Sequence, residues 1–141
     1  MKASESPYCR CMYFASQALA RKVEKLAYKA WEKVNLPPSH GYLLMLVIEN
    51  PGMQPSELVE QLLLTPSTIT RLVEKLETKK LVVRTHEGKE TNIYPSPKGK
   101  ELYPKLKECL SAFYGIYSGI LGKEESARLV NQMNRVSDKL E

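Results

Sequence analysis

QPSELVEQLLLTPSTITRLVEKLETKKLVVRTHEGKETNIYPSPKG, residues 54–99, is the stretch that decides the fold of this 141-residue chain. Two prolines punctuate it: Pro55 precedes the apolar-periodic segment Ser56–Leu64, and Pro66 opens a second one that runs to Lys80. Proline is tolerated in the first turn of a helix, where its missing N–H would have no partner, and Thr65 is a suitable N-cap. The stretch therefore predicts two consecutive helices joined by a very short turn.

A β-hairpin is predicted after the second helix. The β-branched run Leu81–Thr85 and the run Thr91–Tyr94 are separated by the polar, glycine-containing loop His86–Glu90. Ser96-Pro97 then opens another helix. Two helices followed by a two-stranded hairpin are the pattern of a winged helix-turn-helix, a module that places its second helix in the major groove of DNA.

The second helix has one apolar and one polar face. With Ser67 placed at 0° and about 100° per residue, its apolar side chains lie together between about 140° and 240°. They are Ile69, Leu72, Val73 and Leu76. The polar side offers short hydroxyls, one arginine and one lysine, which can hydrogen-bond base edges and hold phosphates. The residues expected to contact DNA there are Ser67, Thr68, Thr70, Arg71 and Lys75. A merely solvated face is the alternative, but serine and threonine are mediocre helix formers that a structural surface does not favour.

The positive charge of the chain is concentrated in the same region. The net charge is +5, and residues 65–105 hold nine Lys or Arg against five Asp or Glu, so +4 of it lies there. A local positive excess is what a surface that binds a polyanion requires. In the hairpin, Arg84 and Lys89 are the residues expected to reach the DNA backbone or the minor groove. A membrane surface could use the same charge, but the helix lacks an outer face rich in Trp, Phe and Leu.

Long helices are predicted on both sides of this region. Apolar residues recur at spacings of three and four from Pro7 to about Asn35, and a further helix, about Ser39–Glu49, is apolar on most faces. After the hairpin, a striped helix from about Pro97 is expected to kink at Pro104 and to break at two glycines, Gly119 and Gly122. A last helix follows these glycines.

These terminal helices carry more apolar surface than a small DNA-binding unit can cover, which favours a homodimer over a self-contained bundle. The expected organisation is an N-terminal dimerisation helix at 1–35, a winged helix-turn-helix at 36–97 and C-terminal dimerisation helices at 98–141. The predicted fold class is mainly α, within the α+β class.

Nothing in the sequence predicts membrane insertion or export. The longest uncharged run, residues 34–48, is interrupted by prolines, a serine and a histidine. The N-terminal segment 1–5 lacks the apolar core of a signal peptide. We therefore expect a cytoplasmic protein whose three cysteines, Cys9, Cys11 and Cys109, are reduced thiols.

The residue inventory argues against an enzyme. There are only two histidines, His40 and His86, no glycine-rich phosphate loop and no Ser/His/Asp motif. A zinc site would combine Cys9-x-Cys11 with His40 or Cys109, but structural zinc sites separate paired cysteines by two to four residues. No catalytic residue, metal or cofactor is expected.

Four segments of the chain fit one known pattern: Pro51–Val59, Leu64–Glu77, Lys80–Arg84 and Pro97–Gly99. Through them the chain resembles the MarR family of bacterial transcriptional regulators, over nearly its whole length. The resemblance implies a homodimer, built on the terminal helices, that binds a pseudo-palindromic operator. It further implies a repressor that leaves DNA when a small phenolic or lipophilic ligand binds, or when a thiol is oxidised.

The hairpin departs from the family pattern. The family usually has Asp-Arg-Arg at the tip, where this chain has Glu87, Gly88 and Lys89, and Leu-Thr after the hairpin, where it has Pro95-Ser96. The family glycine before the first strand is Lys80 here. The arginine expected in the minor groove is thus at best Lys89, which suits a narrow groove less well.

A second resemblance is narrower. Cys9–Gln17 is similar to the first-helix segment of the branch that senses organic hydroperoxides, in which a cysteine near the N-terminus is the reactive thiolate. The resemblance implies that role for Cys9, with Tyr13 one turn on, although Gln17 stands where the branch has arginine. A helix N-terminus and Arg10 would favour a thiolate. The alternative is that Cys9 is inert filler in an apolar helix, the commoner case.

Overall fold

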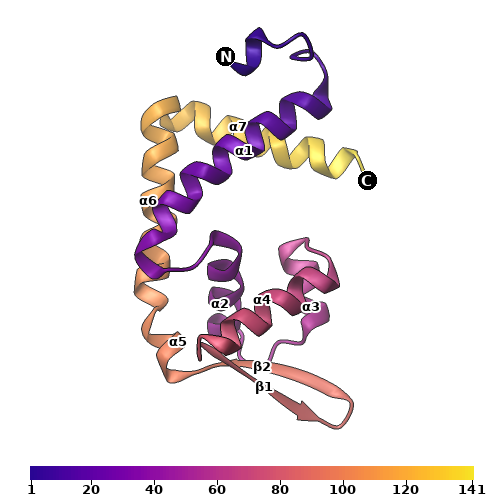
Figure 1. Cartoon of the computed structure of the whole chain (residues 1–141), viewed down its shortest axis with the longest axis vertical. Helices are drawn as coiled ribbons and strands as arrows, with labels where there is room; N and C mark the ends of the chain where they lie inside the picture. Colours follow the sequence, from indigo (N-terminus) through magenta and orange to yellow (C-terminus); the bar gives the residue numbers. More distant parts are fainter. The chain divides into compact units, whose positions relative to one another are not determined.

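The predicted pair of helices and the hairpin are both present in the computed structural model, which describes all 141 residues (Figure 1). The chain is mainly helical, with one two-stranded antiparallel sheet. The predicted fold class is therefore confirmed. The chain divides into two compact units, one formed by residues 1–30 and 110–141 and the other by residues 31–109. No helix is both long and apolar enough to cross a membrane.

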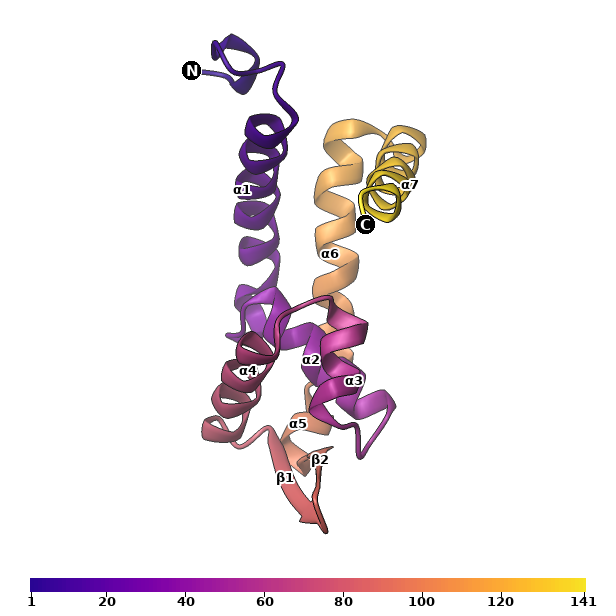
Figure 2. The ribbon, with the colours of Figure 1, turned by 90° about the vertical axis from the view of Figure 1, so that its right-hand side faces the viewer.

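The unit 31–109 holds the winged helix-turn-helix. Its elements are the short 3₁₀ turn η2 (Glu32–Val34), α2 (Pro38–Glu49), α3 (Pro55–Leu62), α4 (Pro66–Thr78), β1 (Val82–Glu87), β2 (Glu90–Pro95), α5 (Pro97–Glu101) and the start of α6 (Tyr103–Leu121). Helix α2 packs against α3, α4, α5 and β2 (Figure 2). It supplies the centre of the core with Leu43, Leu44 and Val47, which have no exposed surface.

The inner face of α4 is the one predicted from its spacing. Ile69, Leu72, Val73 and Leu76 are all buried, with exposed fractions of 7% or less. Helix α4 packs against both α2 and α3, and its far end leads into β1. Burial of the apolar face leaves the opposite, polar face of α4 to solvent.

The hairpin is longer than expected. Strand β1 pairs with β2 from Val82↔Pro95 to Glu87↔Glu90, so the loop is only Gly88-Lys89 and not the whole of His86–Glu90. Gly88 has φ of +66°, the conformation that the first position of a type II′ turn requires and that matches the twist of the flanking strands. The two-residue turn therefore extends the ladder almost to the tip.

The unit formed by residues 1–30 and 110–141 contains the short turn η1 (Ala3–Glu5), most of α1 (Met12–Trp31), the end of α6 and α7 (Lys123–Lys139). Helix α1 begins at Met12, not near Pro7 as expected. The Ser6 hydroxyl accepts the Tyr8 N–H at 3.2 Å, and the Cys9 N–H donates to the Ser6 carbonyl at 3.2 Å. Such local bonds of a serine compete with helical ones and hold the segment before Met12 in turns.

Two further boundaries differ from expectation. Helix α1 ends at Trp31, the η2 turn follows, and Asn35 adopts the left-handed conformation with φ of 55°. The predicted kink at Pro104 is wrong. Helix α5 ends at Glu101 and a separate helix, α6, begins at Tyr103, so Pro104 lies in the first turn of α6. There its missing N–H breaks no helical bond. Gly119 does not interrupt α6; only Gly122, with φ of +91°, separates α6 from α7.

Candidate nucleic-acid interface

The polar face of α4 begins at its N-cap. The Thr65 hydroxyl accepts the Thr68 N–H at 3.3 Å, which satisfies one of the free amides at the start of the helix. Ser67, Thr70 and Arg71 are exposed, and Thr68 is half-buried. The structure therefore brings four of the predicted residues onto one accessible surface, and Lys75, also exposed, lies one turn beyond them.

The hydroxyls on this surface are already hydrogen-bonded to one another. Thr65 Oγ1 lies 2.9 Å from Thr68 Oγ1 and 3.3 Å from Ser67 Oγ, and Arg71 Nη2 donates to Thr68 Oγ1 at 3.3 Å. The Thr70 hydroxyl donates instead to the Pro66 carbonyl at 3.0 Å. The spacing of hydroxyl residues in the sequence predicted the polar face of α4, but it did not predict these hydrogen bonds.

Arg84 is occupied by a partner on α4. Its Nη2 lies 2.6 Å from Glu77 Oε1, and each side chain keeps about a third of its surface exposed. The pair ties β1 to α4 and neutralises the arginine charge locally. Contact between Arg84 and DNA stays a prediction. In the structure the side chain of Arg84 binds α4 through Glu77.

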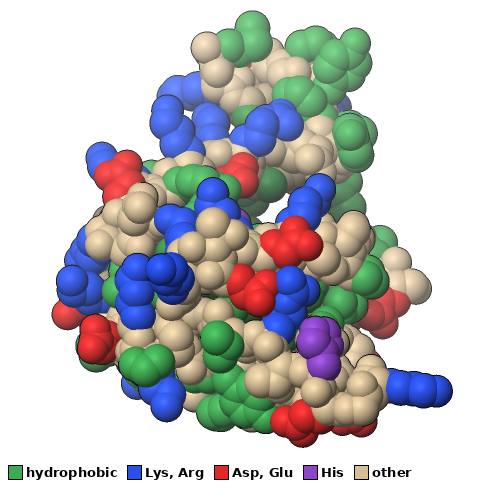
Figure 3. Space-filling view, turned by 60° about the horizontal axis from the view of Figure 1, so that its bottom comes forward, with side chains coloured by type: hydrophobic (Ala, Val, Ile, Leu, Met, Phe, Trp, Pro, Cys, Tyr) green, Lys and Arg blue, Asp and Glu red, His purple; other side chains and the backbone are tan.

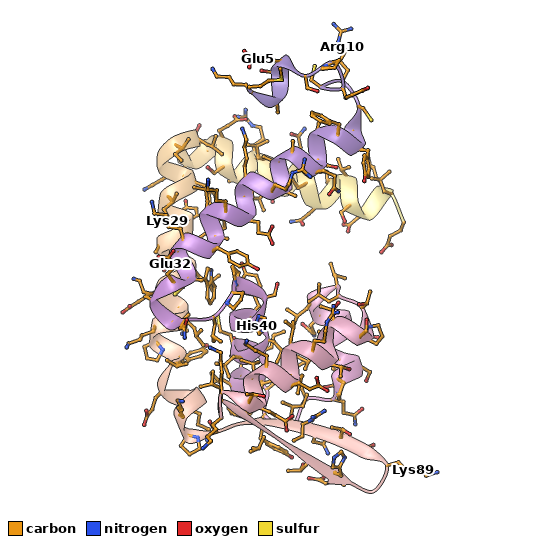
Figure 4. The ribbon with its side chains drawn as sticks, viewed as in Figure 1. Glu5, Arg10, Lys29, Glu32, His40 and Lys89 are labelled. Atoms are coloured by element: carbon orange, nitrogen blue, oxygen red, sulfur yellow. The ribbon has the colours of Figure 1, made fainter.

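Lys89 projects from the hairpin tip into solvent, away from the body of the unit (Figure 4). Glu87 and Glu90 face each other across the ladder directly beside it. Opposed like charges repel, and both carboxylates would also repel phosphates. Lys and Arg side chains are interspersed with acidic ones over this end of the molecule (Figure 3). The tip therefore has a single cation between two anions.

The corner between α4 and β1 depends on contacts that the sequence did not predict. Lys80 has φ of 62°, so a lysine stands in the left-handed conformation at the position where the family has glycine. The Ser96 hydroxyl donates to the Lys80 carbonyl at 2.7 Å and accepts the Gly99 N–H at 3.0 Å. A Cβ on Gly99 would lie 2.2 Å from the Leu81 carbonyl oxygen, so only glycine fits there.

Comparison with known proteins identifies the family of this chain. The family model described as "MarR family" matches residues 34–90. The HTH-type transcriptional regulator SarZ of Staphylococcus aureus (strain MRSA252) is 31% identical over 103 residues, which cover 70% of this chain and 68% of SarZ. The chain belongs to the MarR family. It is thus a DNA-binding transcription regulator with a winged helix-turn-helix, as the resemblance of its sequence implied.

Two other comparisons agree with this membership. The HTH-type transcriptional repressor MdtR of Bacillus subtilis (strain 168) is 28% identical over 112 residues, 77% of this chain and 72% of MdtR. A MarR-family regulator from Listeria monocytogenes, crystallised with a 26-mer DNA, superposes with a TM-score of 0.74 at 19% identity. That superposition covers 93% of this chain and 89% of the other. The second likeness shows that the fold is shared.

A half-buried histidine of this MarR-family regulator lies near α4 and was not predicted to have a role there. His40, at the start of α2, has a buried Nδ1 without a hydrogen-bond partner (Figure 4). Burial lowers the pKa of its imidazole, and the positive charges of Lys75 and Lys79 on α4 lower it further. Lys79 itself donates from Nζ to the Asn35 carbonyl at 3.1 Å. Protonation of His40 would therefore place a third positive charge beneath α4.

The three cysteines occupy three different environments. Cys109 is fully buried, and burial raises the pKa of its thiol. Cys11 is exposed, and Cys9 is half-buried in the turns before α1. The expected place of Cys9 inside the first helix is wrong, so the amides at the N-terminus of α1 do not explain a reactive thiolate there. No group of His, Cys, Asp and Glu is arranged to hold a metal ion.

Cys9 does line a hollow in its own unit. The hollow, of about 410 Å³, lies between the N-terminal turns and α1. Its wall is mostly apolar, with Phe14 and Leu19, and Lys22 supplies the only ionisable amine among the lining residues. A hollow of this size can hold a small aromatic molecule.

Proposed function

We propose that this MarR-family protein is a repressor that binds a pseudo-palindromic operator as a homodimer and leaves it when a small lipophilic or phenolic ligand binds. In the proposed complex each copy places the polar face of α4 in a major groove, with Lys89 on the backbone or in the minor groove. The observation that carries the proposal is the exposed face of Ser67, Thr70 and Arg71 on a helix whose other face is wholly buried. Such a helix is held rigidly and offers hydrogen-bonding groups outward.

Apolar side chains exposed on α1 and α6, and on or just after α7, support the dimer. Tyr13, Ile120 and Leu140 each expose more than two thirds of their surface, with exposed fractions of 76%, 69% and 70%. Other large apolar residues are exposed along the same helices, namely Met12, Leu19, Val23, Leu121, Met133 and Val136. Monomeric soluble proteins rarely leave large apolar patches in water. A second copy is the occupant we propose, with residues 1–35 and 98–141 forming the dimer and residues 36–97 binding DNA.

The hollow beside Cys9 supports the proposal that a small ligand binds. Its apolar wall suits an aromatic ring, and Lys22 suits a phenolate or carboxylate. A ligand there would act on residues of the proposed dimer interface, and so on the spacing of the two α4 helices. The alternative is that Cys9 itself responds to peroxide, which its place in the same hollow and its partial exposure favour over Cys11 and Cys109.

The test begins with selection of an operator from a pool of randomised duplex DNA by the wild-type protein. Light scattering then gives the stoichiometry, for which two chains per operator are expected. Arg71→Ala should lose about 1–3 kcal/mol, or about 5- to 150-fold, in operator affinity. Arg128→Ala is the matched control, because Arg128 is an exposed arginine of α7 that pairs with Glu125 at 3.0 Å. Wild-type affinity of Arg71→Ala would exclude α4 as the reading helix.

Binding of the ligand has its own test. Wild-type protein on its operator is titrated with salicylate as the probe, a small aromatic that has both a phenol and a carboxylate. Release of the operator, and a weaker response in Lys22→Ala, are the expected results. Lys25→Ala is the control, because Lys25 is an exposed lysine about one turn further along α1 and is not among the residues that line this hollow or the one adjoining it. Equal release from wild type and Lys22→Ala would exclude this hollow as the effector site.

A further inference from the structure

Arg71 cannot accept a hydrogen bond, and this fixes the direction of its contact with Thr68. Its guanidinium only donates, so Thr68 Oγ1 must accept from Arg71 Nη2 across their 3.3 Å contact. The Thr68 hydroxyl also lies 2.9 Å from Thr65 Oγ1, a contact in which either oxygen can donate. Thr65 Oγ1 accepts the Thr68 N–H as well, so the N-cap holds Thr68 at two points.

The contacts extend outward to Ser67. Ser67 Oγ lies 3.3 Å from Thr65 Oγ1, and either oxygen can donate in this contact. The hydroxyls of Thr68, Thr65 and Ser67 therefore form one connected set beside Arg71, and the Ser67 side chain is exposed at its outer end.

The same contacts leave Arg71 with a usable fork. One Nη2 hydrogen goes to Thr68, whereas the other Nη2 hydrogen and both Nη1 hydrogens stay free. Two parallel donors from the end of a guanidinium match O6 and N7 of guanine in the major groove. A hydroxyl that already holds the side chain reduces the rotamer entropy that binding would otherwise cost.

We propose that Thr68, held in turn by Thr65, is the positioning residue that sets Arg71 to read a guanine in each half-site. The inference rests on the proposed reading of DNA by α4. Thr68 touches Arg71 and need not touch the base. Ser67, which is exposed at the end of these contacts, offers its hydroxyl toward the base edges. Thr70, whose hydroxyl donates to the Pro66 carbonyl, is left to contact a thymine methyl with its own methyl group.

The experiment measures guanine reading directly. Wild-type protein and variants are titrated against the selected operator and against copies in which one guanine per half-site is replaced by 7-deazaguanine, which lacks the N7 acceptor. For wild type, one such replacement should weaken binding by about 2- to 12-fold, about half of the free energy of a bidentate contact, because the O6 acceptor remains. For Arg71→Ala the same replacement should have no effect.

Thr68→Val removes the hydroxyl and keeps the shape of the side chain, and we expect it to lose most of the 7-deazaguanine penalty. Thr68→Ser restores the hydroxyl and should recover the penalty. Thr78→Val is the matched control, because the Thr78 hydroxyl only donates to the Glu74 carbonyl, at 2.9 Å, near the far end of the same helix. All three should keep the salt dependence of wild type, because no phosphate contact changes.

The outcomes separate the inference from the proposed function. A full penalty in Thr68→Val, or an equal loss in Thr78→Val, would overturn the positioning role. A wild type that binds its operator without a penalty at any guanine would overturn guanine reading by Arg71. A wild type that selects no sequence at all would overturn the proposed function instead. If Thr68→Val unfolds at the assay temperature, Thr68→Ala provides the same comparison without β-branching.

Discussion

Gly41→Ala should destabilise the DNA-binding unit, because Gly41 lies flat against the indole of Trp31. A Cβ there would lie 2.1 Å from Cζ3, 2.7 Å from Cε3 and 2.9 Å from Cη2 of that ring. The ring has no exposed surface and packs edge-to-face on Tyr42 at a centroid distance of 5.4 Å, so it has no room to withdraw. Overpacking of a core costs about 1–3 kcal/mol, and three ring atoms in conflict place this case at the upper end.

Helix propensity offsets part of this cost, since alanine is favoured over glycine in a helix by about 1 kcal/mol. The net loss is about 2 kcal/mol. For a unit of this size, each kcal/mol lowers the melting temperature by about 4–8 °C, so a fall of about 8–16 °C is expected.

Thermal unfolding followed by tryptophan fluorescence is the assay, because Trp31 is the only tryptophan of the chain and lies at the perturbed contact. Gly115→Ala is the matched control on α6, where a Cβ meets nothing within 4 Å, and circular dichroism should show it to be no less stable than wild type. Trp31→Phe should recover part of the loss in the Gly41→Ala background, and circular dichroism measures this double variant because it has no tryptophan. A melting temperature of Gly41→Ala at or above that of wild type would refute this reasoning.

Three other predictions concern charge and redox chemistry. Because the pKa of His40 is lowered in the folded state, the unfolded chain binds the proton more readily, and stability should be full above about pH 6.5 and fall as the pH drops below it. Chemical denaturation between pH 5 and pH 8 should show a weaker fall for His40→Asn but an unchanged one for His86→Gln. Lys89→Ala should reduce the salt slope of operator binding by about 1 and leave the base preference unchanged, and a changed preference would mean that the hairpin reads bases. If Cys9 senses peroxide, sub-stoichiometric cumene hydroperoxide should weaken operator binding by wild type and Cys11→Ser but not by Cys9→Ser; equal responses of all three would exclude that sensor.

Local sequence signals predicted α3 and α4 well, because residues within each segment determine where these helices begin and end. Pro55 and Pro66 mark the first turns of α3 and α4, and the apolar face of α4 follows directly from residue spacing. The segment before Met12 was predicted wrongly because hydrogen bonds to Ser6 compete with a helix that its apolar spacing allowed. The periodicity of apolar residues does not record such competition.

Contacts between distant parts of the chain could not be predicted from the sequence, for a different reason. The closeness of Gly99 to the Leu81 carbonyl, of Gly41 to Trp31, and of Arg84 to Glu77 depends on how finished elements pack. The local sequence around each of these residues does not indicate its contact partner. The family pattern showed that Lys80 replaces a glycine, but only the structure shows that the left-handed conformation persists there.

The same packing shifts the expected source of sequence specificity toward α4. Arg84 is held by Glu77, and Lys89 stands between Glu87 and Glu90 at a tip that has no arginine. A single lysine can hold a phosphate, but it lacks the planar fork that suits a narrow minor groove. Arg71, in contrast, keeps a free fork that the hydroxyls of its own helix orient. In this chain the hairpin is therefore expected to contribute affinity that salt screens, and α4 to contribute the discrimination between bases that salt leaves intact.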